Sequence, residues 1–141
     1  ESSIMTDPEM AMEIINRIHQ MGFRFSIDDY GTGYSSLSYL KQMPLKELKI
    51  DRSFVSDILT DESDAVIVNA TINLAHNLGL QVTAEGVENQ ATLEQLKVEG
   101  CNIAQGYLIS KPMTVEQFGD WIESSPFQSK KTVAETAHLL V

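Results

Sequence analysis

FRFSIDDYGTGYSSL, at residues 23–37, is the stretch that decides the fold. From Phe23 to Ile27 it alternates apolar and polar side chains, which is the period of a strand with at least one buried face. The strand runs into two adjacent acids, Asp28 and Asp29, and then into a loop with two glycines. Because neighbouring residues on a strand point to opposite sides, both acids can face one site only if the backbone turns there. Two carboxylates at the mouth of a buried strand favour a cation between them, most simply a divalent metal.

Composition limits the classes of protein and ligand. The chain has 141 residues, of which 43% are hydrophobic and 21% charged, enough for one compact core. Its formal net charge of −10 argues against sequence-independent binding to duplex nucleic acid. The single cysteine, Cys101, excludes an internal disulfide, and we expect it to be a buried strand thiol.

The sequence has no apolar run of about 18 residues and no signal-peptide pattern at its start. We therefore expect a cytoplasmic protein without direct membrane insertion, although a longer parent protein could be tethered to a membrane.

Apolar runs that end in polar residues predict four strands, starting near residues 23, 48, 80 and 101. Helical patterns separate these runs, so we expect an α/β fold with parallel strands. A complete (β/α)8 barrel takes about 250 residues, so the chain holds roughly four to five of its units. Two architectures are open at this point: a small doubly wound sheet and a partial (β/α)8 barrel. We expect the domain to end near residue 125, with residues 126–141 as a tail or a partly ordered extension.

Two of the predicted helices have clear signals. The longest follows the polar residues 60–64, and its buried face is expected to hold Ile67, Thr71, Leu74 and Leu78. The last follows Thr114 and Gln117, which have the spacing of a capping box.

Polar side chains lie at every predicted strand end. They are Asp28 and Asp29 on the first strand, Lys49 on the second, Glu85 on the third and Gln105 on the fourth. Each has a structural explanation of its own: Lys49 could lie on the surface, Glu85 could cap a turn, and Gln105 could bond to a loop carbonyl. Because functional groups in parallel α/β folds collect at the C-terminal ends of strands, four such ends together favour a site.

The chemistry that this site suggests is metal-assisted attack of water on a phosphate ester. Two divalent ions can hold an anionic phosphate and lower the pKa of a bound water. Carboxylate oxygens suit Mg²⁺ or Mn²⁺ better than Zn²⁺ or copper. Lys49 could orient the water, accept its proton if the lysine pKa is depressed, or stabilise charge on the phosphoryl oxygens. The sequence leaves these three roles open. His19, His76 and His138 show no metal-ligand spacing, and we expect them to be structural or surface residues.

Four motifs follow one another along the chain: DDYGTGYSSL at 28–37, LKIDRSF at 48–54, AEGVE at 84–88 and QGY at 105–107. In order and spacing they resemble the C-terminal half of the EAL-domain family of bacterial cyclic-di-GMP phosphodiesterases. The resemblance implies about the last four βα units of a (β/α)8 TIM-type barrel, with parallel strands. It also implies hydrolysis of cyclic di-GMP to linear pGpG in second-messenger signalling, two Mg²⁺ or Mn²⁺ ions, and a homodimer of the complete domain.

The resemblance assigns roles to individual residues. Asp28 resembles the carboxylate that bridges both metals, and Asp29 and Glu85 resemble ligands of the second metal. Lys49 resembles the catalytic lysine that acts on the nucleophilic water, with Glu85 as the other catalytic group. Gln105 and Asp29 are implied to lie beside the substrate. In the family, one loop couples the metal site, the substrate and the dimer interface, and two acids hold it. The resemblance makes Glu1 and Glu88 these two acids, and the loop corresponds to Gly31, Thr32, Gly33, Tyr34, Ser35 and Ser36.

Parts of the family pattern are missing from the sequence. The Glu-Ala-Leu signature is absent, as are the family's metal-binding asparagine and the glutamate that would stand three residues before Glu1. We therefore expect a half-built metal site, and little or no activity from residues 1–141 alone. We also expect exposed strand edges and apolar helix faces.

Two other classes of protein are open. One is a non-catalytic cyclic-di-GMP sensor or protein-interaction module of the same fold, against which the intact Asp28, Asp29, Lys49 and Glu85 argue. The other is a small α/β domain that swaps or dimerises to complete its sheet, against which a stable monomer would count. An upstream Glu-Ala-Leu segment in the native gene product would favour the enzyme.

Overall fold

The structure is a computed structural model that describes residues 8–31 and 37–127. Glu1, residues 32–36 and His138, which the sequence analysis singles out, lie outside the described residues. In chain order the elements are α2 (Pro8–Gln20), β1 (Phe25–Tyr30), α3 (Leu37–Gln42), β2 (Leu45–Ile50), α4 (Arg52–Ser56), α5 (Glu62–Asn77), β3 (Gln81–Glu85), α6 (Gln90–Val98), β4 (Ile103–Gln105) and α7 (Val115–Ser124).

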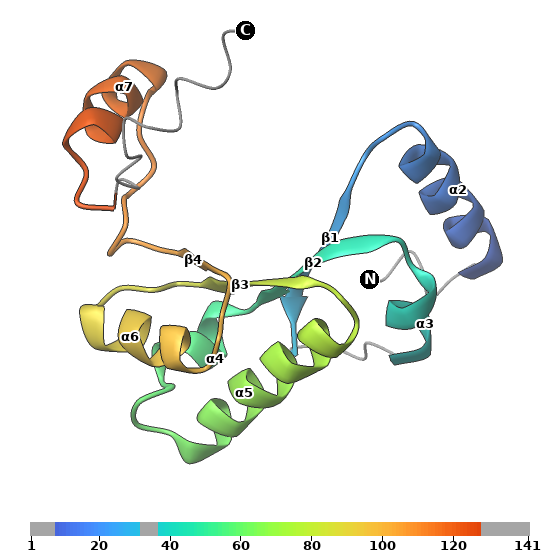
Figure 1. The fold of residues 1–141 in the computed structure, drawn as a ribbon, viewed down its shortest axis with the longest axis horizontal. Coiled ribbons are helices and arrows are strands. Elements are labelled where there is room, and N and C mark those ends of the chain that lie inside the picture. The colour runs from blue at the N-terminus through green and yellow to red at the C-terminus, as the bar shows by residue number, and fades with distance from the viewer. Residues whose placement is uncertain (1–7, 32–36, 128–141) are drawn as a thin grey trace, which may run out of the picture.

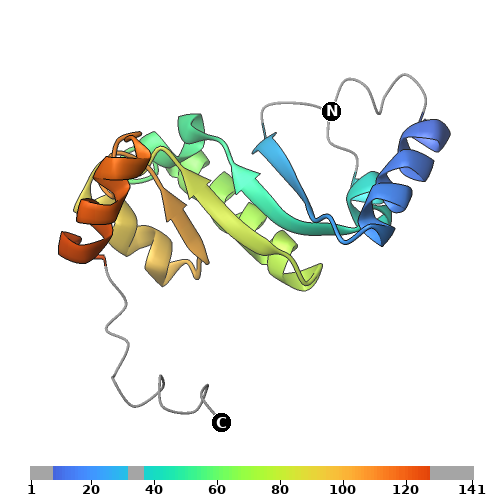
Figure 2. The ribbon, with the colours of Figure 1, turned by 90° about the horizontal axis from the view of Figure 1, so that it is seen from above.

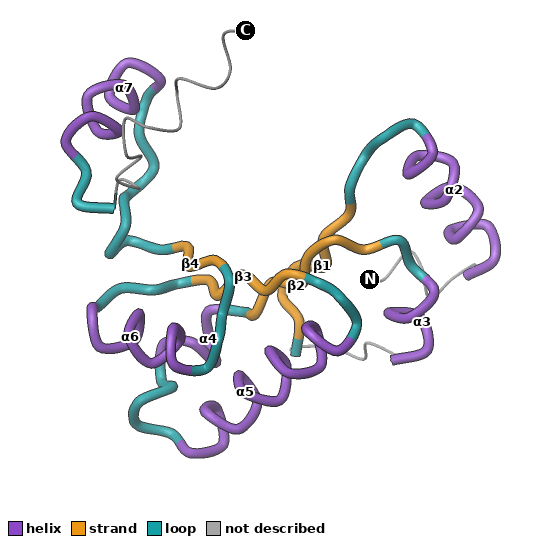
Figure 3. Tube along the Cα trace, in the orientation of Figure 1, coloured by secondary structure: helices purple, strands orange, loops and turns teal. Residues whose placement is uncertain are grey.

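The four strands form one parallel sheet in the order β1-β2-β3-β4. Helices α4, α5 and α6 lie on one face of the sheet, and α2 and α7 lie at its two ends (Figures 1 and 2). Figure 3 shows the strands side by side, with loops leaving their ends. A doubly wound sheet would carry helices on both faces and reverse its strand order at a switch point. Sequential order with helices on one face is instead the arrangement of successive units of a (β/α)8 barrel, so the prediction of a partial barrel is confirmed.

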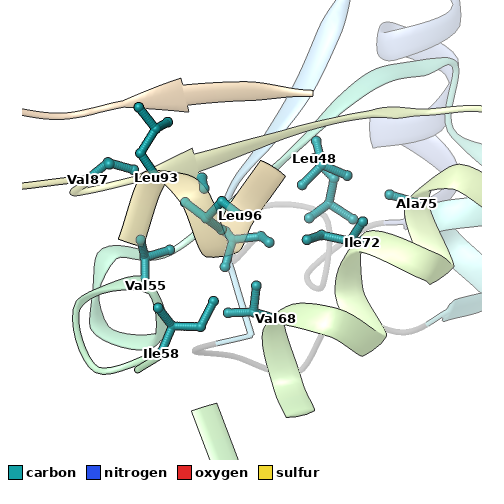
Figure 4. Close-up of a cluster of buried hydrophobic side chains, with 12 residues drawn as sticks. Leu48, Val55, Ile58, Val68, Ile72, Ala75, Val87, Leu93 and Leu96 are labelled. Carbon is teal, nitrogen blue, oxygen red and sulfur yellow. The ribbon is translucent and has the colours of Figure 1, made fainter. Parts of the chain in front are cut away.

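The core lies between the sheet and helices α4 to α6 (Figure 4). Leu48 and Ile50 of β2 are fully buried there, as are Val82 and Ala84 of β3. The helices and the loop after β3 contribute Val55, Ile58, Val68, Ile72, Ala75, Val87, Leu93 and Leu96. Because side chains alternate along a strand, burial of Leu48 and Ile50 against the helices places Glu47 and Lys49 on the opposite, open face.

The observed strands begin at Phe25, Leu45, Gln81 and Ile103, not at residues 23, 48, 80 and 101. The fourth shift has a clear cause in the end of α6. Gly100 adopts a φ of +85°, and the backbone N–H groups of Gly100 and Cys101 donate to Lys97 O and Leu96 O, which is a Schellman motif. The expectation that Cys101 is a strand residue is therefore wrong, because its backbone closes the preceding helix. Its thiol is partly buried and donates to the Val82 and Ile103 carbonyls, and this burial raises the pKa of Cys101.

The two predicted helix starts are confirmed. Asp61 caps α5, and the Thr114–Gln117 capping box begins α7. The buried face of α5 is Val68, Thr71, Ile72 and Ala75, so of the predicted face only Thr71 is fully buried.

Large apolar side chains lie exposed at both ends of the sheet, as expected. Beside the edge strands β1 and β4 and on α7 they include Met21, Phe23, Ile103, Tyr107, Val115, Phe118 and Ile122. Within the described ranges, β1 pairs only with β2 and β4 only with β3, so both outer edges are open. Over the same ranges, no helix combines the length and the hydrophobicity needed to cross a membrane.

Candidate functional site

The predicted site residues lie at the C-terminal ends of the four parallel strands. Lys49 pairs in register with Thr83, and Glu85 pairs with Gln105. These residues lie on the open face of the sheet, because the alternate positions of β2 and β3 face the helices. Asp28 reaches the same group from β1, where it bonds to Lys49.

The end of β1 is irregular at the two adjacent acids. Ile27 pairs with Leu48 and Tyr30 pairs with Ile50, so β1 contains one more residue than β2 between these two pairs, which is a β-bulge. Asp29 has a φ of +53°, a left-handed conformation that aspartate tolerates better than most residues. This bulge turns the backbone as the sequence predicts, and it brings carboxylate oxygens of Asp28, Asp29 and Glu85 within 4.8 Å of one another.

Lys49 joins two of these acids. Its Nζ donates to Asp28 Oδ1 at 2.6 Å and forms a second ion pair with Glu85. The side chains of Lys49 and Glu85 are 19% and 17% exposed, whereas that of Asp28 is 65% exposed. Burial alone would lower the pKa of Lys49, but the hydrogen bonds to Asp28 and Glu85 outweigh it and raise that pKa well above the usual range. Lys49 is therefore an ammonium donor in this arrangement, which supports the orienting and charge-stabilising roles over that of proton acceptor.

Asp51 is a fourth carboxylate at the site, and the sequence analysis did not select it. Partial desolvation and the charges of Asp28 and Asp51 raise the pKa of Asp29, which also shares a hydrogen bond with Asp51. The hydroxyl and the backbone N–H of Ser53 donate to Asp51 at 2.5 and 2.8 Å, and these bonds lower the pKa of Asp51. Asp51 caps α4 and lies two residues beyond Lys49, a spacing that could have indicated a shared face.

The start of α4 and the loop after β3 are tied together beside the acids. Arg52 and Glu88 form an exposed ion pair with an N···O distance of 2.8 Å. Gly86, with a φ of +74°, lies against the Arg52 side chain so closely that a Cβ there would come within 2.8 Å of the Arg52 Cβ. The predicted link between Glu88 and the loop at residues 32–36 lies outside the described residues and stays a prediction. The beginning of that loop packs on Phe54, since a Cβ on Gly31 would lie 2.8 Å from its Cε2.

A shallow pocket opens beside Glu85. It is lined by Arg52, Glu85, Gly86, Glu88, Gln105, Gly106 and Tyr107. The exposed Gln105 thus lies next to the acid cluster, with room for a ligand beside both.

The donor set fits a hard divalent cation. Asp28, Asp29 and Glu85 offer carboxylate oxygens and no nitrogen or sulfur, which is the ligand type that Mg²⁺ and Mn²⁺ prefer. Three carboxylates against one ammonium leave a surplus of negative charge that a metal would compensate. His19 bonds to Phe23 O and His76 to Asn102, as expected of structural residues.

Comparison with known proteins identifies relatives of this chain. The family model described as "EAL domain" matches residues 1–112. The bifunctional diguanylate cyclase/cyclic di-GMP phosphodiesterase MucR of Pseudomonas aeruginosa is 48% identical over 117 residues, which are 83% of this chain and 17% of MucR. Signaling protein YkoW of Bacillus subtilis is 44% identical over 128 residues, 91% of this chain and 16% of YkoW.

Solved structures agree with the sequence relatives. The PaMucR phosphodiesterase in complex with c-di-GMP superposes with a TM-score of 0.77 at 47% identity, over 82% of this chain and 47% of that one. The manganese/cy-diGMP complex of Klebsiella pneumoniae BlrP1 superposes with a TM-score of 0.72 at 31% identity, over 79% of this chain and 29% of that one. The chain therefore spans less than half of these structures and under a fifth of the curated relatives above.

Proposed function

The chain belongs to the EAL domain family, and we propose that it is the C-terminal half of a metal-dependent phosphodiesterase domain that hydrolyses cyclic di-GMP to linear pGpG. One observation carries the proposal. Three carboxylates lie within 4.8 Å of one another at the strand ends, and a lysine bonds to two of them. Relatives named as cyclic di-GMP phosphodiesterases include NbdA of P. aeruginosa, which is 39% identical over 129 residues.

We propose Mg²⁺ or Mn²⁺ as the cofactor, held by Asp28, Asp29 and Glu85. The all-oxygen donor set supports this choice, as does the manganese named in the BlrP1 complex. When bound, such ions would polarise the phosphoryl oxygens and lower the pKa of a coordinated water. Asp28, Asp29 and Glu85 would supply the carboxylates that hold these ions.

The remaining residues bind and orient. The Lys49 ammonium would orient the water or stabilise charge on the phosphoryl oxygens. Glu85, which pairs with Lys49, would be the other catalytic group. Gln105 and Asp29 would contact cyclic di-GMP, since Gln105 lines the pocket beside Glu85. Asp51 would add a fourth negative charge beside Asp29, next to the metal ligands. Glu88 would anchor its loop through Arg52 and so support the coupling of residues 31–36, with Glu1, to the dimer interface.

The chain alone is proposed to be inactive or nearly so. Residues 1–125 would form half of the domain, residues 126–141 an extension, and the other half would complete the metal ligands and the homodimer. The coverage of 47% of the MucR phosphodiesterase structure supports this division.

A non-catalytic sensor of cyclic di-GMP is the second candidate. The observation that favours it is the ion pairing of Lys49 with Asp28 and Glu85, which compensates part of the negative charge without a metal. The upstream sequence of the native protein separates the two candidates, because only an enzyme needs the Glu-Ala-Leu segment and the remaining metal ligands.

The test combines metal binding with turnover. Mn²⁺ is titrated into the purified chain and followed by electron paramagnetic resonance, with Asp28→Asn as the variant and Asp57→Asn, an exposed acid on another loop, as the control. We expect Asp28→Asn alone to lose Mn²⁺ binding, and the pure chain to leave cyclic di-GMP uncleaved. The native protein carrying the upstream ligands should cleave cyclic di-GMP to pGpG and lose this activity with Lys49→Ala. Robust cleavage by the isolated chain would refute the half-site, and a native protein with all ligands but no cleavage would refute the enzyme.

A further inference from the structure

A second layer of polar residues lies beneath the acid cluster. On the open face, Glu47 precedes Lys49 by two residues, and Thr83 of the neighbouring strand pairs in register with Lys49. The Thr83 hydroxyl donates to the Glu47 carboxylate. Thr83 is only 2% exposed, so this bond is shielded from water.

The register shows that Glu47 leans toward the site. Its direct partner is Gln81, yet its carboxylate bonds to Thr83, two residues closer to the C-terminal ends of the strands. Long side chains can reach such diagonal neighbours. The bonded pair therefore lies on the same face as Lys49, with Thr83 beside it on β3 and Glu47 one same-face position before it on β2.

Glu47 has an alternative partner if this bond is absent. Same-face neighbours on a strand lie about 7 Å apart, so a free Glu47 carboxylate could swing up to the Lys49 ammonium. It would then compete with Asp28 and Glu85, which hold that ammonium now. Because Thr83 is buried and its hydroxyl engages Glu47, this exchange is suppressed.

We propose that Glu47 and Thr83 form a positioning pair that keeps the Lys49 ammonium between Asp28 and Glu85. Neither residue touches the reacting atoms; both act through Lys49. The position of the Lys49 ammonium does not depend on the proposed function. Only the effect of that position on catalysis rests on it.

The test follows Lys49 directly in the purified chain, without metal or substrate. The ¹⁵Nζ–¹Hζ signal of Lys49 is assigned by its loss in Lys49→Arg, and its exchange with water is measured. Thr83→Val removes the donor at nearly constant shape and frees the Glu47 carboxylate, and the double variant Thr83→Val/Glu47→Ala removes that carboxylate as well. Thr83→Ser and Glu47→Gln keep a donor and an acceptor. Gln81→Ala, on the same face and in register with Glu47, is the matched control.

We expect Thr83→Val to speed exchange of the Lys49 ammonium protons by about fivefold, the worth of one ordinary hydrogen bond, because the freed Glu47 draws the ammonium away from Asp28 and Glu85. The double variant Thr83→Val/Glu47→Ala, which has no competing carboxylate, should return to wild-type exchange. Thr83→Ser, Glu47→Gln and the control should behave as the wild type, which a general loss of packing would not allow. Wild-type exchange in Thr83→Val with intact amide spectra, or equally fast exchange in the double variant, would overturn the proposal. If Thr83→Val does not fold, Thr83→Ala, which removes the same donor, takes its place.

In the active native protein, Thr83→Val should lower kcat and leave KM for cyclic di-GMP unchanged, and Thr83→Val/Glu47→Ala should recover kcat. Failure of the two proposals is distinguishable, because the exchange measurement needs no turnover. An inactive native protein in which Thr83→Val still frees Lys49 would refute only the enzyme, whereas activity with an undisturbed Lys49 would refute only the positioning pair.

Discussion

Gly106 lies at the closest backbone approach beside the site, and its substitution is a sharp test of the fold. A Cβ at Gly106 would lie 2.7 Å from the carbonyl carbon of Val87 and nearer still to the Val87 nitrogen and oxygen. Two hydrogen bonds frame this contact: Val87 N–H donates to Gln105 O and Leu108 N–H donates to Val87 O, both at 3.0 Å. The contact therefore fixes the end of β4, where Gln105 lies, against the loop that follows Glu85.

Gly106→Ala must separate these two segments, because none of the three obstructing atoms belongs to a flexible side chain. The two framing hydrogen bonds are worth about 1 kcal/mol each, and forcing an extra methyl group into a packed site costs about 1–3 kcal/mol. We expect the free energy of unfolding to fall by roughly 3–5 kcal/mol, a large part of the 5–15 kcal/mol typical of a domain.

Gly119→Ala is the matched control, since the same methyl group there meets no atom within 4 Å. Gly119 lies inside α7, where alanine is favoured over glycine by up to about 1 kcal/mol, so this variant should be neutral or slightly stabilising. Urea unfolding followed by circular dichroism at 222 nm measures both variants. A Gly106→Ala loss below about 1 kcal/mol, or an equal loss in Gly119→Ala, would refute the reasoning.

Three further predictions concern charges at the site. Asp29→Asn should raise the thermal midpoint of the chain in chelator at pH 7, because the raised pKa of Asp29 means that its charged form disfavours the fold. The gain should shrink as the pH falls through that raised pKa and be lost below the ordinary aspartate pKa of 3.8, and a lower midpoint at pH 7 would contradict this. Lys49→Gln should be less stable than the wild type by a constant amount between about pH 6 and pH 10, where the partner carboxylates are charged. The difference should shrink in stronger alkali, because a raised lysine pKa gives stability that is lost as the pH rises through it, and thermal melts across this range detect any other dependence. Arg52→Ala and Glu88→Ala should show a coupling below about 1 kcal/mol in a double-mutant cycle, because the pair is exposed, and a larger coupling would show that the contact between α4 and the loop after β3 depends on it.

The sequence predicts the strand ends of the site well. Lys49, Glu85 and Gln105 follow apolar runs, and parallel strands bring their C-terminal ends to one edge whatever the details of packing. This is why the group can be named before its geometry is known. The strand boundaries are less certain. Gly100 and Cys101 form the C-terminal cap of α6 through backbone hydrogen bonds, and apolar periodicity does not reveal such bonds.

Two features of the site could not be read from the sequence. One is the extra residue of β1, since two adjacent acids indicate that the backbone must turn but not that Asp29 takes the left-handed conformation with Tyr30 still in the strand. The other is Asp51, whose role as a helix cap and partner of Asp29 depends on how far the β1 bulge carries Asp29 toward β2. The face of α5 was misjudged for a similar reason: α5 packs on α4 as well as on the sheet, so Val68 and Ile72 are buried while Ile67 is only partly so.

The ion pairs of Lys49 lead to a last prediction about the metal. The ammonium bonds to Asp28 and Glu85, two of the three carboxylates proposed as ligands, so lysine and metal draw on the same oxygens. Lys49→Met removes the competing charge at similar length, and one unit charge at about 4 Å is worth several kcal/mol at an effective dielectric constant near 20. We therefore expect Lys49→Met to bind Mn²⁺ at least about tenfold more tightly than the wild type, even though catalysis would be lost. The comparison is made by Mn²⁺ titration of both chains, with Asp28→Asn added to each to show that binding is at this site. Equal or weaker binding by Lys49→Met would mean that Lys49 supports the ligands rather than competing for them, and that lysine and metal are held together in the resting site.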